Sequence, residues 1–124
     1  MRNSLLFTAL IAILTFSACE EPLEEFKNGA PSPFAVQPVI LNDSTAKIMW
    51  SKSIDPDGDS VIYDVYLSGA IQGASLRTTE FRFPQNLNSQ ITYTGTVIAK
   101  DPFLAETQVA FSFKTSGNDT TSSN

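Results

Sequence analysis

The chain of 124 residues contains no histidine and a single cysteine, Cys19. Without histidine it lacks the side chain that most often acts as a general base near neutral pH. A single cysteine cannot form a disulfide within the chain, and no serine has a neighbouring base that would activate it as a nucleophile. The sequence therefore predicts a protein without catalytic residues, whose body is stabilised by an apolar core instead of cross-links.

Basic residues are also scarce. The chain has 8 Lys and Arg residues against 13 Asp and Glu residues, which gives a formal net charge of −5. A nucleic-acid-binding protein needs a basic patch to meet the phosphates. This charge balance excludes nucleic acid as an expected partner, and it also argues against a polybasic surface that binds membranes by charge.

The N-terminal segment has the order of features found in a secretory signal. Arg2 precedes the apolar residues 5–16, and the small residues Ser17 and Ala18 come directly before Cys19. The apolar run is shorter than the roughly 20 residues that a membrane-spanning helix needs. The segment resembles the lipobox of bacterial lipoprotein signals, which implies cleavage after Ala18 and lipid attachment to Cys19. The alternative is an ordinary signal peptide that leaves Cys19 as a free thiol.

An acidic spacer follows Cys19. Four glutamates lie within residues 20–25, and like charges at this density repel one another and keep the chain extended and solvated. The run resembles the surface-export signal of lipoproteins from the Bacteroidota, which implies display on the outer face of the outer membrane. The alternative is a plain disordered tether. We therefore expect a lipoprotein of the bacterial cell envelope, attached to the outer membrane through Cys19.

Residues 31–116 are predicted to form one antiparallel β-domain. Apolar residues recur at every second position in short runs that turn residues separate, which is the pattern of half-buried strands. The expected strands cover residues 33–39, 46–51, 62–67, 81–83, 91–100 and 109–113. About seven short strands at this spacing are typical of an immunoglobulin-like β-sandwich. The flanking segments are predicted as a signal peptide (1–18), a lipidated tether (19–30) and a disordered polar tail (117–124).

Particular residues narrow this prediction. Trp50, the segment Tyr63-Asp64-Val65-Tyr66 and the spacing from Leu87 to Tyr93 resemble the fibronectin type III family. The resemblance covers the whole predicted domain and implies that Tyr93 forms a tyrosine corner, packing inward while its hydroxyl bonds to nearby backbone. It also implies structural roles for Trp50, Tyr63 and Leu87.

One acidic cluster, Asp55-Pro56-Asp57-Gly58-Asp59, lies between the second and third expected strands. Asp first, Pro second and Gly fourth are the preferences of a type I turn. Three carboxylates at alternate positions could also converge on Ca²⁺, which takes six to eight oxygen ligands, and Asp101 follows a strand that ends at the same end of a type III sandwich. The spacing does not match an EF-hand. We therefore favour the turn over a Ca²⁺ site at Asp55, Asp57, Asp59 and Asp101, and expect no other cofactor.

Two surfaces are candidates for binding a partner. Phe103 and Leu104 form an apolar loop tip suited to anchoring an interface, unless Phe103 folds back over the end of the sandwich. Ile62, Tyr66 and Ile98 are expected to form an apolar strip on the outer face of the sheet, where single exposed apolar residues are also normal.

The expected function is a non-catalytic, lipid-anchored binding or adhesion module for a protein or glycan partner. The alternatives are a structural accessory lipoprotein of an envelope or surface complex and, more remotely, an enzyme that hydrolyses glycosides with paired carboxylates. The motifs Asp43-Ser44-Thr45 and Asp119-Thr120-Thr121 resemble the O-glycosylation acceptor of exported Bacteroidota proteins, which implies glycans attached at these sites.

Overall fold

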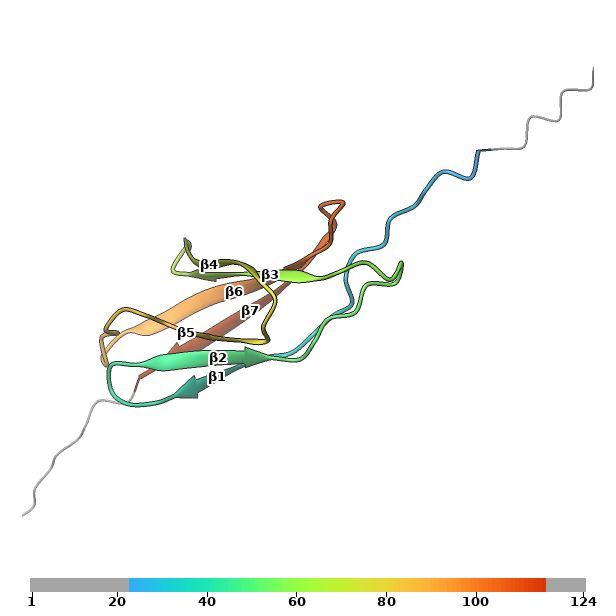
Figure 1. The fold of residues 1–124 in the computed structure, drawn as a ribbon. Helices are drawn as coiled ribbons and strands as arrows, with labels where there is room; N and C mark the ends of the chain where they lie inside the picture. Colours follow the sequence, from blue (N-terminus) through green and yellow to red (C-terminus); the bar gives the residue numbers. More distant parts are fainter. Residues whose placement is uncertain (1–22, 116–124) are drawn as a thin grey trace, which may run out of the picture.

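The computed structural model describes residues 23–115, which form two antiparallel sheets packed face to face (Figure 1). The strands are β1 (Val36–Ile40), β2 (Ala46–Trp50), β3 (Ile62–Leu67), β4 (Ala70–Leu76), β5 (Glu80–Arg82), β6 (Thr92–Lys100) and β7 (Glu106–Lys114). The smaller sheet has the order β1-β2-β5, and the larger sheet has the order β4-β3-β6-β7. The predicted all-β sandwich is therefore confirmed. Cys19, the expected signal peptide and Asp119-Thr120-Thr121 lie outside the described residues.

The core lies between the sheets and consists of the alternate positions that the sequence pattern indicated. Val65 is fully buried, and the buried ring of Phe83 stacks on Phe113 with the ring centroids 5.6 Å apart. Trp50 and Tyr63 meet across the two sheets with ring centroids 5.3 Å apart. Burying a large apolar side chain contributes about 1.5–3 kcal/mol, so this aromatic core stabilises the sandwich without a disulfide.

The predicted tyrosine corner is present. The hydroxyl of Tyr93 accepts a hydrogen bond from the backbone N–H of Asn88 at 2.7 Å, and Leu87 is part of the buried core. The hydroxyl of Tyr63 makes a second contact of this kind, accepting from the buried backbone N–H of Ser53 at 2.8 Å. Both tyrosines therefore tie a loop to the core through a hydroxyl that finds a partner, as buried tyrosines usually do.

Strand β4 is the element whose position the sequence did not predict. It pairs with β3 through a hairpin in which Ser68 and Gly69 both have positive φ, as a type I′ turn requires. Its register then shifts, and the backbone N–H of Ser75 donates to the buried carboxylate of Asp64 at 2.8 Å. Lys100 forms an ion pair with the same carboxylate. Within residues 23–115, no helix has the length and apolar character to cross a bilayer.

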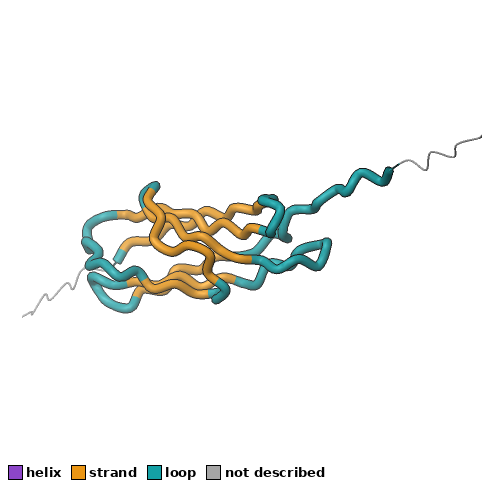
Figure 2. Tube along the Cα trace, turned by 45° about the horizontal axis from the view of Figure 1, so that its top comes forward, coloured by secondary structure: helices purple, strands orange, loops and turns teal. Residues whose placement is uncertain are grey.

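The chain enters the sandwich at the end that carries the β2–β3 and β6–β7 loops, and this is called the tether end below (Figure 1). The other end carries the β1–β2, β3–β4 and β5–β6 connections, and loops gather at both ends in Figure 2. Ser32 fastens the incoming chain to the body, because its N–H donates to the carbonyl of Ile54 at 2.8 Å and its hydroxyl accepts from the N–H of Ile54 at 2.9 Å.

Candidate functional site

The β2–β3 loop at the tether end is organised by Asp55. Its carbonyl accepts from the N–H of Gly58 at 3.2 Å, and its Oδ1 accepts from the N–H groups of Asp57 at 2.8 Å and Asp59 at 3.4 Å. Gly58 has a φ of 82°, in the left-handed region that glycine adopts without strain. The turn expected from the sequence is therefore formed, and the side chain of Asp55 is drawn into the protein, where only 4% of the residue is exposed.

The β6–β7 loop repeats this turn in the segment Asp101-Pro102-Phe103-Leu104-Ala105. The carbonyl of Asp101 accepts from the N–H of Leu104 at 3.3 Å. Oδ1 of Asp101 accepts from the N–H groups of Phe103 at 2.8 Å and Ala105 at 2.9 Å. Leu104 has a φ of 68° and occupies the position of the glycine in the other loop. The shared Asp-Pro start was the only sequence signal for this repeat.

Two residues of the expected tether form hydrogen bonds with these loops. The side-chain amide of Asn28 donates to Oδ2 of Asp101 at 2.5 Å, and the N–H of Gly29 donates to Oδ2 of Asp57 at 2.6 Å. A Cβ at Gly29 would lie 2.5 Å from Cγ of Pro56, so only glycine allows the chain to approach this closely. Hydrogen bonding between the spacer and the body therefore begins at Asn28, a residue that sequence reasoning did not single out.

The tether end carries a high density of negative charge. Burial and repulsion from Asp55, Asp101 and Asp57 raise the pKa of Asp59 above its ordinary value. Burial also acts against ionisation of Asp101, but hydrogen bonds from Asn28 and from the loop backbone prevail and lower the pKa of Asp101.

Two buried oxygen atoms at the tether end have no hydrogen-bond partner, Oδ2 of Asp55 and Oδ1 of Asn28. A cavity of about 560 Å³ opens beside Asp55 and Asp59. Within residues 23–115, no group of three or more acidic, cysteine or histidine side chains already stands in a metal-binding arrangement. The four predicted aspartates thus share one end of the molecule, but their carboxylates do not form a ready-made cage.

The predicted loop tip is exposed at the tether end. Phe103 is 58% exposed and Leu104 is 81% exposed. The ring of Phe103 lies against Phe26 of the tether with ring centroids 5.5 Å apart. Phe103 therefore does not cover the core of the sandwich.

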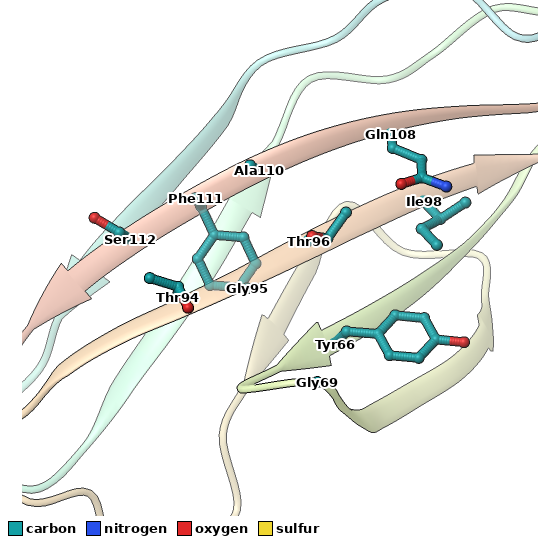
Figure 3. Close-up of a pocket in the computed structure, with 10 residues that line it drawn as sticks. All are labelled: Tyr66, Gly69, Thr94, Gly95, Thr96, Ile98, Gln108, Ala110, Phe111 and Ser112. Atoms are coloured by element: carbon teal, nitrogen blue, oxygen red, sulfur yellow. The ribbon is translucent and has the colours of Figure 1, made fainter.

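The outer face of the larger sheet carries a shallow pocket of about 690 Å³ (Figure 3). Figure 3 shows Tyr66, Ile98 and Gln108 following one another across β3, β6 and β7. Of the predicted apolar strip, Tyr66 and Ile98 line this pocket, and Ile62 lies further along the same face of β3. Gly95 leaves room for the ring of Phe111, because a Cβ at Gly95 would lie 2.3 Å from Cζ of that ring.

The pocket lining combines an aromatic ring with neutral hydrogen-bonding groups. Thr94, Thr96 and Ser112 supply hydroxyls and Gln108 supplies an amide, and none of the ten lining residues is charged. Such a surface can stack on a flat apolar face of a ligand while its rim exchanges hydrogen bonds with hydroxyl groups.

Neither family models nor curated proteins match the chain. Among solved structures, the chain is similar to a mutant of FN3tt, with 26% identity, a TM-score of 0.51 and coverage of 71% of this chain and 96% of that one. The crystal structure of FN3tt itself gives 26% identity, a TM-score of 0.49 and coverage of 69% and 91%. A family 28 exopolygalacturonase from Yersinia enterocolitica gives 16% identity and a TM-score of 0.53, and the match covers 72% of this chain but only 20% of the enzyme.

The likeness to the FN3tt mutant shows the class of domain. The chain has a fibronectin type III-like fold, with seven strands in two antiparallel sheets. Domains of this fold are commonly non-catalytic modules that bind partners or serve structural roles, and the fold alone does not select a partner.

Proposed function

We propose that this protein is a non-catalytic binding module of the bacterial cell envelope, anchored by lipid on Cys19, which binds a neutral glycan on the outer face of its larger sheet. The fibronectin type III-like fold supports a binding role, and the lipobox-like segment before Cys19 supports the anchor. The acidic residues 20–25 supply the spacer between lipid and body.

The absence of charged residues from the pocket on the larger sheet is the observation that favours a neutral glycan as the ligand. Tyr66 and Ile98 offer apolar surface, and Thr96 and Gln108 offer hydrogen-bonding groups beside it. Sugars present apolar ring faces edged by hydroxyls, so this combination matches their chemistry better than that of a charged ligand.

The direction of anchoring also favours the sheet face. A lipid on Cys19 would draw the tether end toward the membrane, together with Phe103 and Leu104. The pocket lies on the side of the sandwich, along strands β3, β6 and β7, and therefore stays accessible to a soluble or envelope-bound glycan.

Binding of purified protein to immobilised neutral oligosaccharides tests the ligand. Tyr66→Ala should weaken binding by about fivefold to tenfold, since stacking on an aromatic ring contributes roughly 1–1.5 kcal/mol. Met49→Ala is the matched control, because Met49 is exposed on the smaller sheet and its loss should leave binding unchanged.

The double variant Phe103→Ala and Leu104→Ala separates the two surfaces. Binding that survives Tyr66→Ala but is lost in the double variant would move the site to the loop tip. Capture of an envelope protein without any oligosaccharide binding would favour the accessory role in a complex.

Anchoring is tested by cell fractionation of Cys19→Ala. The variant should leave the membrane fraction while keeping the thermal unfolding of the sandwich unchanged, and a variant that stays membrane-bound would overturn the anchor. Protease accessibility on intact cells tests display on the outer face.

A further inference from the structure

We propose that the tether end binds one Ca²⁺ ion between the tether and the two Asp-Pro loops, with Oδ2 of Asp55 and Oδ1 of Asn28 as ligands. The site would fasten the incoming chain to the sandwich. It is separate from the sheet pocket, so its test is independent of the proposed glycan binding.

The first ligand, Asp55, is a buried carboxylate with one unused oxygen. Its Oδ1 is occupied by the N–H groups of Asp57 and Asp59, whereas its Oδ2 is buried without a donor. A carboxylate oxygen removed from water without a partner is unfavourable unless a donor or a cation compensates it. Asp101, which forms the equivalent turn, has its Oδ2 paired with Asn28. The Asp55 oxygen is therefore the unsatisfied member of an otherwise matched pair.

The second ligand, Asn28, is a neutral side chain that comes from the tether. Its Nδ2 donates to Asp101, and its Oδ1 is buried without a partner. Gly29, the next residue, is bonded to Asp57 and packs on Pro56. The amide oxygen of Asn28 is therefore held against the same loops that contain the unused oxygen of Asp55.

The donor set selects Ca²⁺ among common metal ions. All available ligands are carboxylate and amide oxygens on irregular loops, which Ca²⁺ accepts in flexible geometry, whereas Mg²⁺ demands a near-ideal octahedron. The half-buried Asp59 at the edge of the adjoining cavity supplies a further carboxylate, and water fills the remaining positions. Because no three acidic side chains of residues 23–115 are already arranged around a metal, we expect weak affinity of about 10⁻⁴–10⁻³ M, as in extracellular modules.

Occupancy of this site would change how the body is held. Asn28 belongs to the tether, whereas Asp55 belongs to the β2–β3 loop, so an ion shared by both adds a link between spacer and sandwich. The sandwich would then project from the anchored spacer in one orientation at millimolar Ca²⁺ and would move more freely when Ca²⁺ is absent.

Calorimetric and thermal titration of the purified full chain in non-ionic detergent with CaCl₂ alone tests the site. Millimolar Ca²⁺ should release or absorb heat with a stoichiometry near one and raise the unfolding temperature, and Asn28→Ala should remove both effects. Asp43→Asn removes one negative charge from the β1–β2 loop at the opposite end, and this control for general charge effects should behave like the unaltered protein. No heat and no thermal shift up to 10 mM would overturn the site, and so would an equal response to Mg²⁺.

Limited proteolysis gives a second measurement that does not depend on the stability of the loops. Lys27 is exposed and directly precedes Asn28, so an endoproteinase that cleaves after lysine and needs no Ca²⁺ reports on this junction. Cleavage after Lys27 should slow by about tenfold in saturating Ca²⁺. Cleavage after the exposed Lys52 is the internal control, because it reports any general effect of Ca²⁺ on the tether end of the sandwich. A rate at Lys27 that ignores Ca²⁺ would contradict the proposed link.

Discussion

The β2–β3 and β6–β7 loops begin with the same dipeptide, Asp-Pro, and fold into the same turn, but they differ in the hydrogen bonding of the aspartate and in the residues at the tip. In each, the first aspartate accepts from the N–H groups two and four residues later, and the fourth residue has positive φ. The aspartate of the β6–β7 loop is fully bonded, because Asn28 donates to its second oxygen. The aspartate of the β2–β3 loop keeps an oxygen without a donor. The same turn therefore occurs twice at this end, once with both carboxylate oxygens of its aspartate hydrogen-bonded and once with a buried oxygen that has no donor.

The tips of the two loops differ as well. The β2–β3 loop places Asp57 and Gly58 at its tip, whereas the β6–β7 loop places Phe103 and Leu104 there. A left-handed backbone costs a non-glycine residue roughly 1–2 kcal/mol, and Leu104 accepts this strain while staying mostly exposed. Strain of this kind concentrates at functional positions, which keeps the apolar tip a candidate contact surface.

The largest expected effect comes from removing each aspartate. Asp101→Ala leaves the N–H groups of Phe103 and Ala105 and the amide of Asn28 without an acceptor, and buried donors left unsatisfied are costly. It should lower the unfolding temperature by about 10–20 °C, since 1 kcal/mol corresponds to about 4–8 °C in a domain of this size. Asp55→Ala should lower it less in Ca²⁺-free buffer, because it also removes the unpaired oxygen. Differential scanning calorimetry measures both, and an equal or reversed order would contradict the comparison.

A smaller effect is expected from exchanging the residues with positive φ. Gly58→Ala should lower the free energy of unfolding by about 1–2 kcal/mol, because alanine is strained in the left-handed region. Leu104→Gly should raise it by about 0.5–1 kcal/mol, since the relieved strain exceeds the entropy that glycine loses on folding. Urea denaturation measures both changes. The conservative control is Leu104→Met, which keeps the strain and should be nearly neutral.

Much of the sandwich could be predicted because its core residues alternate along the strands. The Leu87 to Tyr93 spacing correctly predicted the tyrosine corner, since this motif is local in sequence. Strand β4 was not placed, because its residues lack an alternating apolar pattern and its pairing with β3 shifts register. The carboxylate of Asp64 is paired with Lys100 and Ser75 as a result of that shift, so its role was not visible either.

The candidate site was predicted only in part. The Asp, Pro and Gly positions of residues 55–58 indicated the β2–β3 turn. The resemblance to a type III sandwich placed Asp101 at the same end of the molecule. Asn28 was missed because a single asparagine in a polar spacer carries no periodic signal, and its partner Asp101 is 73 positions away. The repeat of the turn at Asp101 was missed because leucine disfavours the positive φ that Leu104 adopts.

The smallest expected effect is the pH dependence of the two loops, measured as unfolding temperature in Ca²⁺-free buffer. The folded-state pKa of Asp59 is raised above its ordinary value of 3.8, so its charge opposes folding at neutral pH, and this opposition disappears as the pH falls below that value. The folded-state pKa of Asp101 is lowered from 3.8, so its charge supports folding at neutral pH, and this support is lost as the pH falls through the lowered pKa.

Isosteric amides should therefore act in opposite directions. Asp59→Asn should raise the unfolding temperature at pH 7, and its advantage should vanish below about pH 4, where the unaltered carboxyl is also neutral. Asp101→Asn should lower the unfolding temperature at pH 7, and its deficit should shrink over the same acidic range. Saturating Ca²⁺ should cancel the advantage of Asp59→Asn, because a bound cation neutralises the repulsion that the substitution relieves. If both variants shift stability in the same direction at pH 7, the two loops do not differ in the way their aspartates are satisfied.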